Sequence, residues 1–464
     1  MNKNKIITPW DLDESLVSLI PCDAYKLVHR LMYPKNVQNL YLTFTARGNK
    51  NHEFKDISWN HLFVKKVVNN ILNNFTKHVI KLSQENSNGR ITKLLKNKLN
   101  NVFQSKKFSE NFINVLKELG KSICETKKLP IVVKAYKSSD NIPFQKSLMI
   151  ITGKKNINPN FVWLITYFET IILENIWQFS TSLTIARDYF KLVEHYAELS
   201  ADNLNFIKYQ CHDFSMRGMS SLWSAIYSGN AHLMYFEGSD TIISGNNAKS
   251  VFASEHSVMS IDGQINEFNT YKRLINQFPN DILSLVSDTW NIWNVLDNIL
   301  PKLKKDILKR KKKLVIRPDS GDPIEIICGK KNFNWKNKNT WGVIHYLDYH
   351  FGHKINKKGF KELHPKIGII YGDAITYKRT KAILENLTNQ KYSSKNIVFG
   401  VGATTYQSTN RDTLGFVSKI TSVCQINQNN KKVWNNVEKN PITDYKKKSL
   451  TGRFTKDKNL IKIY

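Results

Sequence analysis

A series of short polar motifs in this chain contains the residue types that bind phosphates, sugars and flat bases. Most of the motifs follow a short apolar run, as in LSLVSD, KLVIRPDSG, IGIIYGD and NIVFGVG. A buried strand that leads into a polar loop, repeated at helix-length intervals, predicts an α/β barrel with its site at one rim. In chain order the motifs are HDFSMRG (212–218), GSDT (238–241), SEHS (254–257), SDTWN (287–291), RPDSGDP (317–323), YGD (371–373) and FGVGAT (399–404).

The motif RPDSGDP offers an arginine and a carboxylate close together. The guanidinium group of Arg317 has the planar geometry that suits a phosphate, and the carboxylate of Asp319 can accept both hydrogen bonds of a vicinal ribose diol. A salt-bridged turn shaped by proline and glycine explains the same residues equally well. Asp373, after the apolar run IGIIYG, is likewise either a ribose ligand or a turn cap.

The glycines of FGVGATTYQSTNRD indicate a second kind of phosphate contact. Gly400 and Gly402 would expose backbone N–H groups at the N-terminus of a helix, where a phosphate binds well. A lone G-x-G also occurs in ordinary tight turns. Arg411, further along the same stretch, favours the phosphate interpretation.

Three other loops carry groups that suit a planar base and a reactive imidazole. Phe214 and Arg217 flank a tight segment and can stack on a flat heterocycle, although a phenylalanine is also an ordinary core residue. Asp240 can accept a hydrogen bond from an amide N–H group or cap a helix. His256, beside Glu255, is either a general base or phosphoryl acceptor, or an exposed loop histidine. The joint order of these residues, more than any single one, favours one shared site.

The length and composition indicate a folded protein with more than one core. A chain of 464 residues with 41% hydrophobic residues is long enough for two domains. It contains no apolar run of about 18 residues, so we expect no membrane span, and its N-terminus lacks the apolar region of a signal peptide. The five cysteines form no CxxC pair. Reduced thiols, a cytoplasmic location and the absence of a zinc site follow as expectations.

The formal net charge of +31 invites comparison with nucleic-acid-binding proteins. The lysines, however, are spread along the chain among many Asn and Ile residues. Solvated surface lysines explain this distribution more simply than a dedicated nucleic-acid surface. We therefore expect no nucleic-acid partner, although some lysines can serve anionic phosphate substrates.

The elements that must position the motifs fall into two groups. We expect an irregular (β/α) barrel over residues 166–419, and a second, discontinuous α+β domain from residues 1–165 and 420–464. Apolar residues recur at helical spacing from about 55 to 128, which predicts a helical insertion in the second domain.

Two further segments carry expectations of their own. The helical run over 161–199 is expected to break near 179–181. The basic stretch rich in Gly, Asn and His at 329–365 is expected to be a loose surface insertion.

The order, residues and spacing of the motifs resemble those of the nicotinamide phosphoribosyltransferase family, a type II phosphoribosyltransferase family. The resemblance runs from DAYKLVHRLMYP (23–34) through the motif series to the Lys-rich tail, and so covers nearly the whole chain. It implies that nicotinamide and 5-phosphoribosyl-1-diphosphate react to give nicotinamide mononucleotide and diphosphate, as a step of NAD salvage. It also implies Mg²⁺, held mainly by the diphosphate, ATP as a coupling substrate, and a homodimer with shared active sites.

The resemblance gives roles to the residues around the pyridine ring. Phe214 would stack on one face of nicotinamide, and Tyr25 would cover the other face from the partner subunit. Arg217 and Ser284 would also line this pocket. Asp240 would accept a hydrogen bond from the carboxamide, and its charge would repel nicotinate.

The resemblance also gives roles to residues around the phosphates and the ribose. Arg317 would meet phosphate, while Asp319 and Asp373 would face ribose hydroxyls. Further phosphate and diphosphate contacts would come from Gly402, Arg411, Lys419, Lys439 and Lys447, and from Arg47 across the dimer.

His256 matches the histidine that the family phosphorylates with ATP. Glu255 and Asp288 would orient its ring, and Asp319 completes the expected catalytic group. The loop GVGATT departs from the longer glycine run of the family, so Ala403 is expected to retune the affinity for phosphate.

Two alternatives remain open from the sequence. A nicotinate phosphoribosyltransferase would share the fold and the phosphohistidine, but Asp240 disfavours a negatively charged substrate. A non-catalytic basic binding protein on the same scaffold would explain the +31 charge. It would not explain why Arg317, Asp319, Asp373 and His256 are all present.

Overall fold

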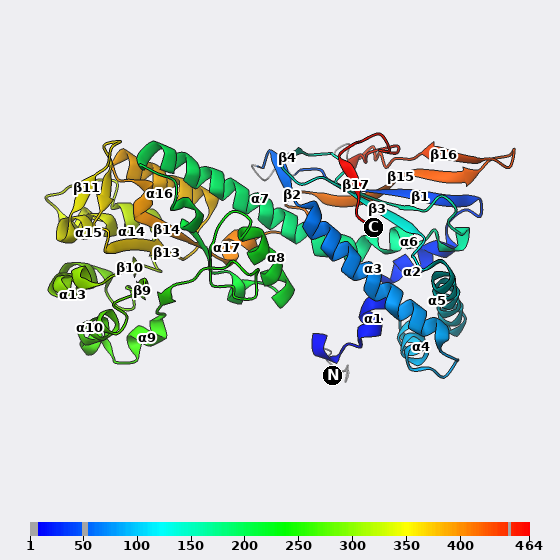
Figure 1. Cartoon of the computed structure of the whole chain (residues 1–464), viewed down its shortest axis with the longest axis horizontal. Helices are drawn as coiled ribbons and strands as arrows, with labels where there is room; N and C mark the ends of the chain where they lie inside the picture. Colours follow the sequence, from blue (N-terminus) through cyan, green and yellow to red (C-terminus); the bar gives the residue numbers. More distant parts are fainter. Residues whose placement is uncertain (1–7, 49–53, 444–446) are drawn as a thin grey trace. The chain divides into compact units, whose positions relative to one another are not determined.

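The structure is a computed structural model, and it describes residues 8–48, 54–443 and 447–464. The chain forms two compact units, one from Met1–Ser180 with Arg411–Tyr464 and one from Thr181–Asn410 (Figure 1). Residues 1–7, part of the N-terminus expected to lack a signal peptide, lie outside the described ranges. Within those ranges no helix is both long and apolar enough to cross a bilayer.

The unit Thr181–Asn410 is built on a seven-stranded sheet in the order β7-β6-β14-β13-β10-β9-β8. Every pairing along this order is parallel. Parallel strands buried on both faces consist of continuous apolar residues, as the sequence predicted for these runs. The strands are β6 (Cys211–Asp213), β7 (Gly238–Ser239), β8 (Phe252–Ala253), β9 (Leu283–Val286), β10 (Leu314–Arg317), β13 (Ile367–Tyr371) and β14 (Ile397–Val401).

This sheet curls into an incomplete barrel. Lys249 bridges to Gly238 in β7, and β8 starts at Phe252, three residues after Lys249 (252 minus 249). Three residues reach at most about 10 Å. In a flat sheet of seven strands the two outer strands would lie roughly 29 Å apart at about 4.8 Å per strand. The sheet must therefore bend its edges β7 and β8 toward each other, which confirms the predicted irregular (β/α) barrel.

Helices follow the barrel strands and begin at residues that cap them well. Ser221, Asp322 and Thr376 each accept a backbone N–H bond at the start of α8, α14 and α16. Figure 1 shows α14, α15 and α16 beside β10, β13 and β14. The helices of this unit are α8 (Leu222–His232), α9 (His256–Ser260), α10 (Glu267–Gln277), α11 (Ile292–Asn294), α12 (Leu300–Lys302), α13 (Lys304–Lys309), α14 (Pro323–Cys328), α15 (Val343–Phe351), α16 (Tyr377–Asn389) and α17 (Ala403–Tyr406).

The segment 329–365 is packed, so the expectation of a loose insertion was wrong. Seven of the nine residues of α15 (Val343–Phe351) are buried. The ring of His345 stacks on Phe333 with centroids 3.9 Å apart, and β11 (His353–Ile355) pairs with β12 (Lys361–Leu363). The Gly and Asn residues had suggested a loop, but Phe333 and the apolar face of α15 bury enough surface to fix it.

The expected helix break near residues 179–181 is also absent. The helix α7 runs without interruption over Glu169–Ser200. Its sequence contains no glycine or proline, the residues that most strongly end a helix, so the Ser and Thr residues at 180–182 do not break it.

The other unit is built on a six-stranded antiparallel sheet in the order β16-β15-β1-β5-β3-β17. Three of its strands come from the N-terminal part of the chain and three from the C-terminal tail. This arrangement confirms the predicted discontinuous α+β domain. The strands are β1 (Val37–Ala46), β3 (Ile131–Tyr136), β5 (Met149–Gly153), β15 (Phe416–Ile426), β16 (Lys432–Asn436) and β17 (Leu460–Lys462).

The predicted helical insertion forms three amphipathic helices next to this sheet. They bury a shared apolar face, to which Leu72, Leu95 and Leu116 each contribute one fully buried side chain. The polar residues 85–89 separate the first helix from the second. The elements are α3 (His61–Gln84), α4 (Arg90–Phe103) and α5 (Lys106–Thr126), with α1 (Glu14–Leu19), α2 (Ala24–Val28), α6 (Leu164–Tyr167) and the small pair β2 (Asp56–Trp59) and β4 (Ser139–Pro143).

Candidate active site

The barrel brings many of the predicted site residues to one edge. Parallel strands all end at the same edge of their sheet, so residues that directly follow the strands meet there. This edge is the rim that the sequence pattern predicted. The residues at or just after the strand ends are Phe214 (β6), Asp240 (β7), Glu255 and His256 (β8), Asp288 (β9), Arg317 and Asp319 (β10), Asp373 (β13) and Gly402 (β14).

The ring of Phe214 lies in a slot made by two glycines. A Cβ atom added at Gly400 would stand 2.5 Å from the ring, and one added at Gly372 would stand 3.3 Å from it. A side chain at Gly400 would therefore clash with the ring, and one at Gly372 would press against it. The guanidinium carbon of Arg317 is 5.9 Å from the centroid of the same ring. The slot gives Phe214 a fixed position beside a cation.

The carboxylate of Asp240 is held from two directions. Oδ1 accepts a hydrogen bond from Nε2 of His212 at 2.9 Å and another from the hydroxyl of Ser250. Burial by itself raises the pKa of Asp240, but these hydrogen bonds and the charges of His212 and Arg317 outweigh it, and the pKa lies below its usual value. Asp240 is therefore ionised at neutral pH.

Three carboxylates gather around the buried Tyr371. The pKa of this phenol is raised, first by burial and then by the charges of Asp373, Asp288 and Asp319. Asp319 is also next to the Phe214 slot, since a Cβ atom at Gly372 would stand 3.2 Å from its Oδ1. The ribose-binding candidates Asp319 and Asp373 thus belong to one acidic group.

His256 lies at the first position of α9 with its side chain half exposed. Its Nδ1 is 3.1 Å from the hydroxyl of Thr289, and its Nε2 is 3.8 Å from Oδ2 of Asp319. The two carboxylates expected to orient the ring have other hydrogen-bond partners. Glu255 accepts a hydrogen bond from Ser257. Asp288 accepts through Oδ2 from the backbone N–H of Asp319, at 2.9 Å, and from the hydroxyl of Ser320.

Four further predicted residues of this unit have simpler surroundings. Ser284 lies within β9, and its buried hydroxyl has no hydrogen-bond partner among the described residues. Arg217 is exposed in a short turn after Phe214. Gly402 precedes the four-residue helix α17, and its carbonyl accepts hydrogen bonds from the backbone N–H groups of Thr405 and Tyr406. The methyl group of Ala403 lies 2.5 Å from the Cβ position of Gly218, so this alanine requires a glycine opposite it.

The cationic residues predicted to bind phosphate form a cluster within the other unit. Arg47, Lys419 and Lys447 line one pocket of about 310 Å³ on the face of β1 and β15. Burial lowers the pKa of Lys419, and nearby cations lower it further against the opposing charge of Glu169. Those cations are Lys439, Lys26 and Arg47. So many positive charges in one pocket favour an anionic ligand.

The remaining predicted residues of that unit lie at its surface. Tyr25 is 57% exposed in α2, and its hydroxyl donates to Asp23. The backbone N–H of Lys439 donates to the hydroxyl of Ser449 at 2.8 Å, and the guanidinium group of Arg411 pairs with Asp412 at 3.0 Å. The ring of Tyr25 is therefore exposed to solvent in the single chain.

Sequence reasoning did not single out His212, Ser250 or Thr289. His212 and Thr289 lie within the motifs HDFSMRG and SDTWN. Their position next to predicted site residues was therefore a usable signal. Ser250 stands in an irregular loop, and only the backbone bridge between Gly238 and Lys249 brings it near Asp240. Nothing in the local sequence indicated that contact.

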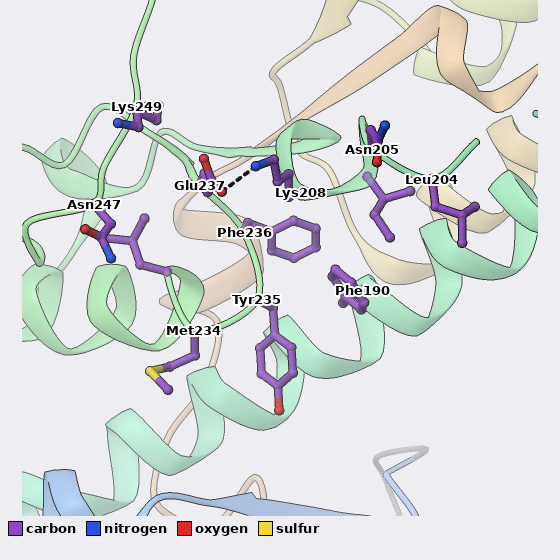
Figure 2. A pocket seen from close by; sticks show the side chains of 12 residues that line it. Phe190, Leu204, Asn205, Lys208, Met234, Tyr235, Phe236, Glu237, Asn247 and Lys249 are labelled. Atoms are coloured by element: carbon purple, nitrogen blue, oxygen red, sulfur yellow. Dashed lines mark hydrogen bonds and ion pairs between the residues drawn. The ribbon is translucent and has the colours of Figure 1, made fainter.

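A second hollow lies beside the segments that precede β6 and β7, away from the rim, and Figure 2 shows the side chains that line it. This cavity of about 820 Å³ is lined by aromatic rings such as Phe190, Tyr235 and Phe236. Lys208 and Glu237 form an ion pair of 2.8 Å at its wall. None of the predicted site residues lines it.

The barrel sheet brings carboxylates, an arginine and an aromatic ring together at one rim of an α/β fold. The sequence model of the nicotinate phosphoribosyltransferase (NAPRTase) family matches residues 209–463. A nicotinamide phosphoribosyltransferase of Mycoplasma pneumoniae is 50% identical over 98% of this chain and 99% of its own length. One of Acinetobacter baylyi is 35% identical over 93% of this chain and 86% of its own length.

Solved structures show the same fold at low sequence identity. A nicotinate-nucleotide pyrophosphorylase from Pyrococcus furiosus aligns with a TM-score of 0.53 and 14% identity, over 98% of this chain and 82% of that one. Human nicotinic acid phosphoribosyltransferase aligns with a TM-score of 0.50 and 13% identity, over 87% and 74%. The chain belongs to the nicotinate phosphoribosyltransferase family, which confirms the resemblance of the motifs and makes the protein a pentosyltransferase.

Proposed function

We propose that this enzyme transfers the phosphoribosyl group of 5-phosphoribosyl-1-diphosphate to nicotinamide. The products are nicotinamide mononucleotide and diphosphate, as in NAD salvage. The observation that carries the proposal is the ionised carboxylate of Asp240 at the same barrel edge as the ring of Phe214. The names of two relatives, 50% and 49% identical to this chain, support the same substrate.

The charges at the rim suit the reaction at C1 of the ribose. The C1–O bond to diphosphate breaks as the pyridine nitrogen attacks, and C1 becomes positively charged in the transition state. Phe214 would hold the ring by stacking, Arg317 would bind phosphate, and Asp319 and Asp373 would accept from the ribose hydroxyls. Fixed charges and positioning supply such catalysis, so no protein nucleophile is needed at C1.

A nicotinate-specific enzyme is the nearest competing function, since the family carries that name. A second anion beside Asp240 would be repelled, whereas the N–H₂ group of an amide can donate to it. The ratio of kcat/KM for nicotinamide to that for nicotinate tests this directly. A preference for the acid in the wild-type enzyme would contradict the proposal.

ATP coupling through His256 is a further part of the proposal. The imidazole is half exposed and so can reach a phosphoryl donor, and its Nδ1 contacts Thr289. We expect His256→Ala to abolish ATP hydrolysis and to leave some ATP-independent synthesis, because the C1 chemistry does not use the ring. Equal loss of both activities would contradict this division.

We expect the diphosphate to hold most of the Mg²⁺ coordination, and a carboxylate of the acidic group at the rim to contribute a further ligand. Oδ1 of Asp288 is buried without a hydrogen-bond partner among the described residues, and oxygen ligands of this kind suit Mg²⁺. The described ranges contain no group of three His, Cys, Asp or Glu side chains that could hold a metal. When bound, the ion would neutralise charge on the leaving diphosphate, while Asp319 and Asp373 position the ribose.

The proposal includes a homodimer in which a partner copy supplies Tyr25 and Arg47 to the barrel rim. The exposed ring of Tyr25 supports this arrangement. A cytoplasmic location also belongs to the proposal, and the five free cysteines fit a reducing compartment.

One assay tests the central claim. The purified enzyme is incubated with nicotinamide, 5-phosphoribosyl-1-diphosphate and Mg²⁺, with and without ATP. Nicotinamide mononucleotide and diphosphate are then quantified. We expect both products in equal amounts, and more of them with ATP; no mononucleotide under either condition would overturn the proposed function.

A further inference from the structure

His212 connects the two groups that are proposed to recognise nicotinamide. It is the middle residue of β6 (Cys211–Asp213), and Asp240 directly follows the neighbouring parallel strand β7. The register pairs His212 with Gly238 and Asp213 with Ser239. The bond of 2.9 Å from Nε2 to Asp240 therefore spans two adjacent strands, and the barrel itself fixes its geometry.

The imidazole ring of His212 is confined on two sides. A Cβ atom added at Gly238 would stand 2.8 Å from its Nδ1, so the ring lies close against the backbone of β7. The ring of Phe214 lies 4.9 Å away at an interplanar angle of 45°. The side chain of His212 is only 10% exposed. With so little room, the imidazole has one position from which to hold Asp240.

The hydrogen bonds divide the two oxygens of Asp240 between the protein and a ligand. Oδ1 takes both hydrogen bonds, from His212 and Ser250. In the described part of the chain no hydrogen bond to Oδ2 is found. A carboxylate can accept through either oxygen, so Oδ2 is left for the N–H₂ group of a bound amide. A donor on Oδ1 also stabilises the charged form, the form that repels a carboxylate ligand.

We propose that His212 is a positioning residue for substrate selectivity: by donating through Nε2, it keeps Asp240 ionised and oriented with Oδ2 available to a pyridine carboxamide. The inference rests on the proposed function and goes beyond it, since it assigns the discrimination between amide and acid to a pair of side chains. His212 itself acts through Asp240 and need not touch the substrate.

Two substitutions at position 212 separate the hydrogen bond from the packing. His212→Leu keeps a side chain of similar size but removes the donor, whereas His212→Gln retains an N–H group near the position of Nε2. The measured quantity is kcat/KM for nicotinamide divided by kcat/KM for nicotinate. We expect His212→Leu to lower this ratio at least about tenfold, the effect of one hydrogen bond to a charged group, and His212→Gln to keep most of it.

A double-mutant cycle with Asp240→Asn tests whether His212 acts through Asp240. We expect His212→Leu to change the ratio little once Asp240 is replaced, because there is no carboxylate left to hold. An unchanged ratio in folded His212→Leu, or an equal loss with and without Asp240, would overturn the inference. The KM for 5-phosphoribosyl-1-diphosphate is a control for general damage and should change less than twofold.

A measurement on the wild-type enzyme covers the case in which the variants do not fold. Nitrogen-15 NMR of the histidine side chains, with His212→Gln or the assigned spectrum to identify the signal, reports which ring nitrogen carries the proton. We expect a protonated Nε2 at pH 7.5, and an unprotonated Nε2 would overturn the inference. The wild-type ratio itself tests the proposed function, so an acid-preferring wild type with a protonated Nε2 would refute that function and not the pairing.

Discussion

The two units of the chain present opposite chemistries. The barrel rim carries Asp240, Asp319 and Asp373 beside an aromatic ring and a single strand-end arginine. The pocket on the antiparallel sheet carries Arg47, Lys419 and Lys447 among hydroxyl groups, and none of the described residues that line it is a carboxylate. Parallel strands deliver loop residues to one edge, whereas antiparallel strands present side chains from one face.

This difference indicates a division of recognition. The rim suits hydroxyl groups, an amide and a cationic transition state, and the pocket suits phosphate groups. Changes to the rim carboxylates and Phe214 should therefore affect the pyridine and the ribose, while changes in the pocket should affect the phosphates. The following predictions test that separation, from the largest expected effect to the smallest.

Loss of a rim carboxylate should have the largest effect. We expect Asp319→Asn to reduce kcat/KM for 5-phosphoribosyl-1-diphosphate roughly a hundredfold or more, because two hydrogen bonds from a ribose diol to a charged group are weakened. Steady-state kinetics checks it. Glu385→Gln on the outside of α16 is the matched loss of charge and should leave the kinetics unchanged. A loss below tenfold in Asp319→Asn would remove the ribose role.

Acid should destabilise the barrel unit through His345. Burial lowers the pKa of His345 to about 4, while Nδ1 accepts from Gly342 and Nε2 binds Gln390. Below pH 6.5 the unfolded histidine binds a proton that the folded one refuses, so the stability falls as the pH drops toward 4. The loss approaches about 3 kcal/mol by linkage.

Urea unfolding followed between pH 7 and 4 measures this effect. His345→Asn should flatten the pH dependence of the free energy of unfolding, whereas His195→Gln, at an exposed position on α7, should not. If both variants retain the wild-type slope, burial of His345 is not its source.

Loss of a pocket lysine should act on the phosphates alone. We expect Lys419→Gln to raise the KM for 5-phosphoribosyl-1-diphosphate about ten- to thirtyfold, the size of one partly buried charge contact, and to reduce its dependence on salt. The KM for nicotinamide should stay within twofold. Lys432→Gln, exposed on β16, is the matched control. A larger change for nicotinamide than for the phosphate substrate would break the comparison.

The glycine slot at the rim gives the smallest and most selective effect. A methyl group in Gly400→Ala would stand 2.5 Å from the ring of Phe214 and 2.7 Å from the Cα atom of Gly372. It would displace the ring, strain the backbone just after β13, and weaken stacking on the base by about 1–2 kcal/mol, or roughly tenfold in the KM for nicotinamide. Gly402→Ala is the contrasting variant, because its Cβ position is 3.9 Å from the nearest other atom. Equal effects on nicotinamide would argue against the slot.

Much of the fold could be predicted from the sequence because buried parallel strands appear in it as continuous apolar runs. Each apolar run with a polar end became a strand with a rim residue, as in Leu314–Arg317 followed by Asp319. Composition gave the wrong prediction where the burial of a few side chains determined the local structure. The composition of the stretch 329–365 suggested a loop, but in the structure His345, Phe333 and α15 pack together.

The sequence alone determined the family, the barrel and the identity of the rim residues, since the residues of each motif and the apolar runs before them are local properties of the chain. The partners of those residues were decided only by the tertiary structure. The partner of Asp240 is His212 on the next strand, and the partner of His256 is Thr289 and not Glu255. The ring of Phe214 lies against Gly400 in β14 and Gly372 just after β13. Such contacts join segments far apart in the chain, and their distances depend on strand register and curl, which no local pattern specifies.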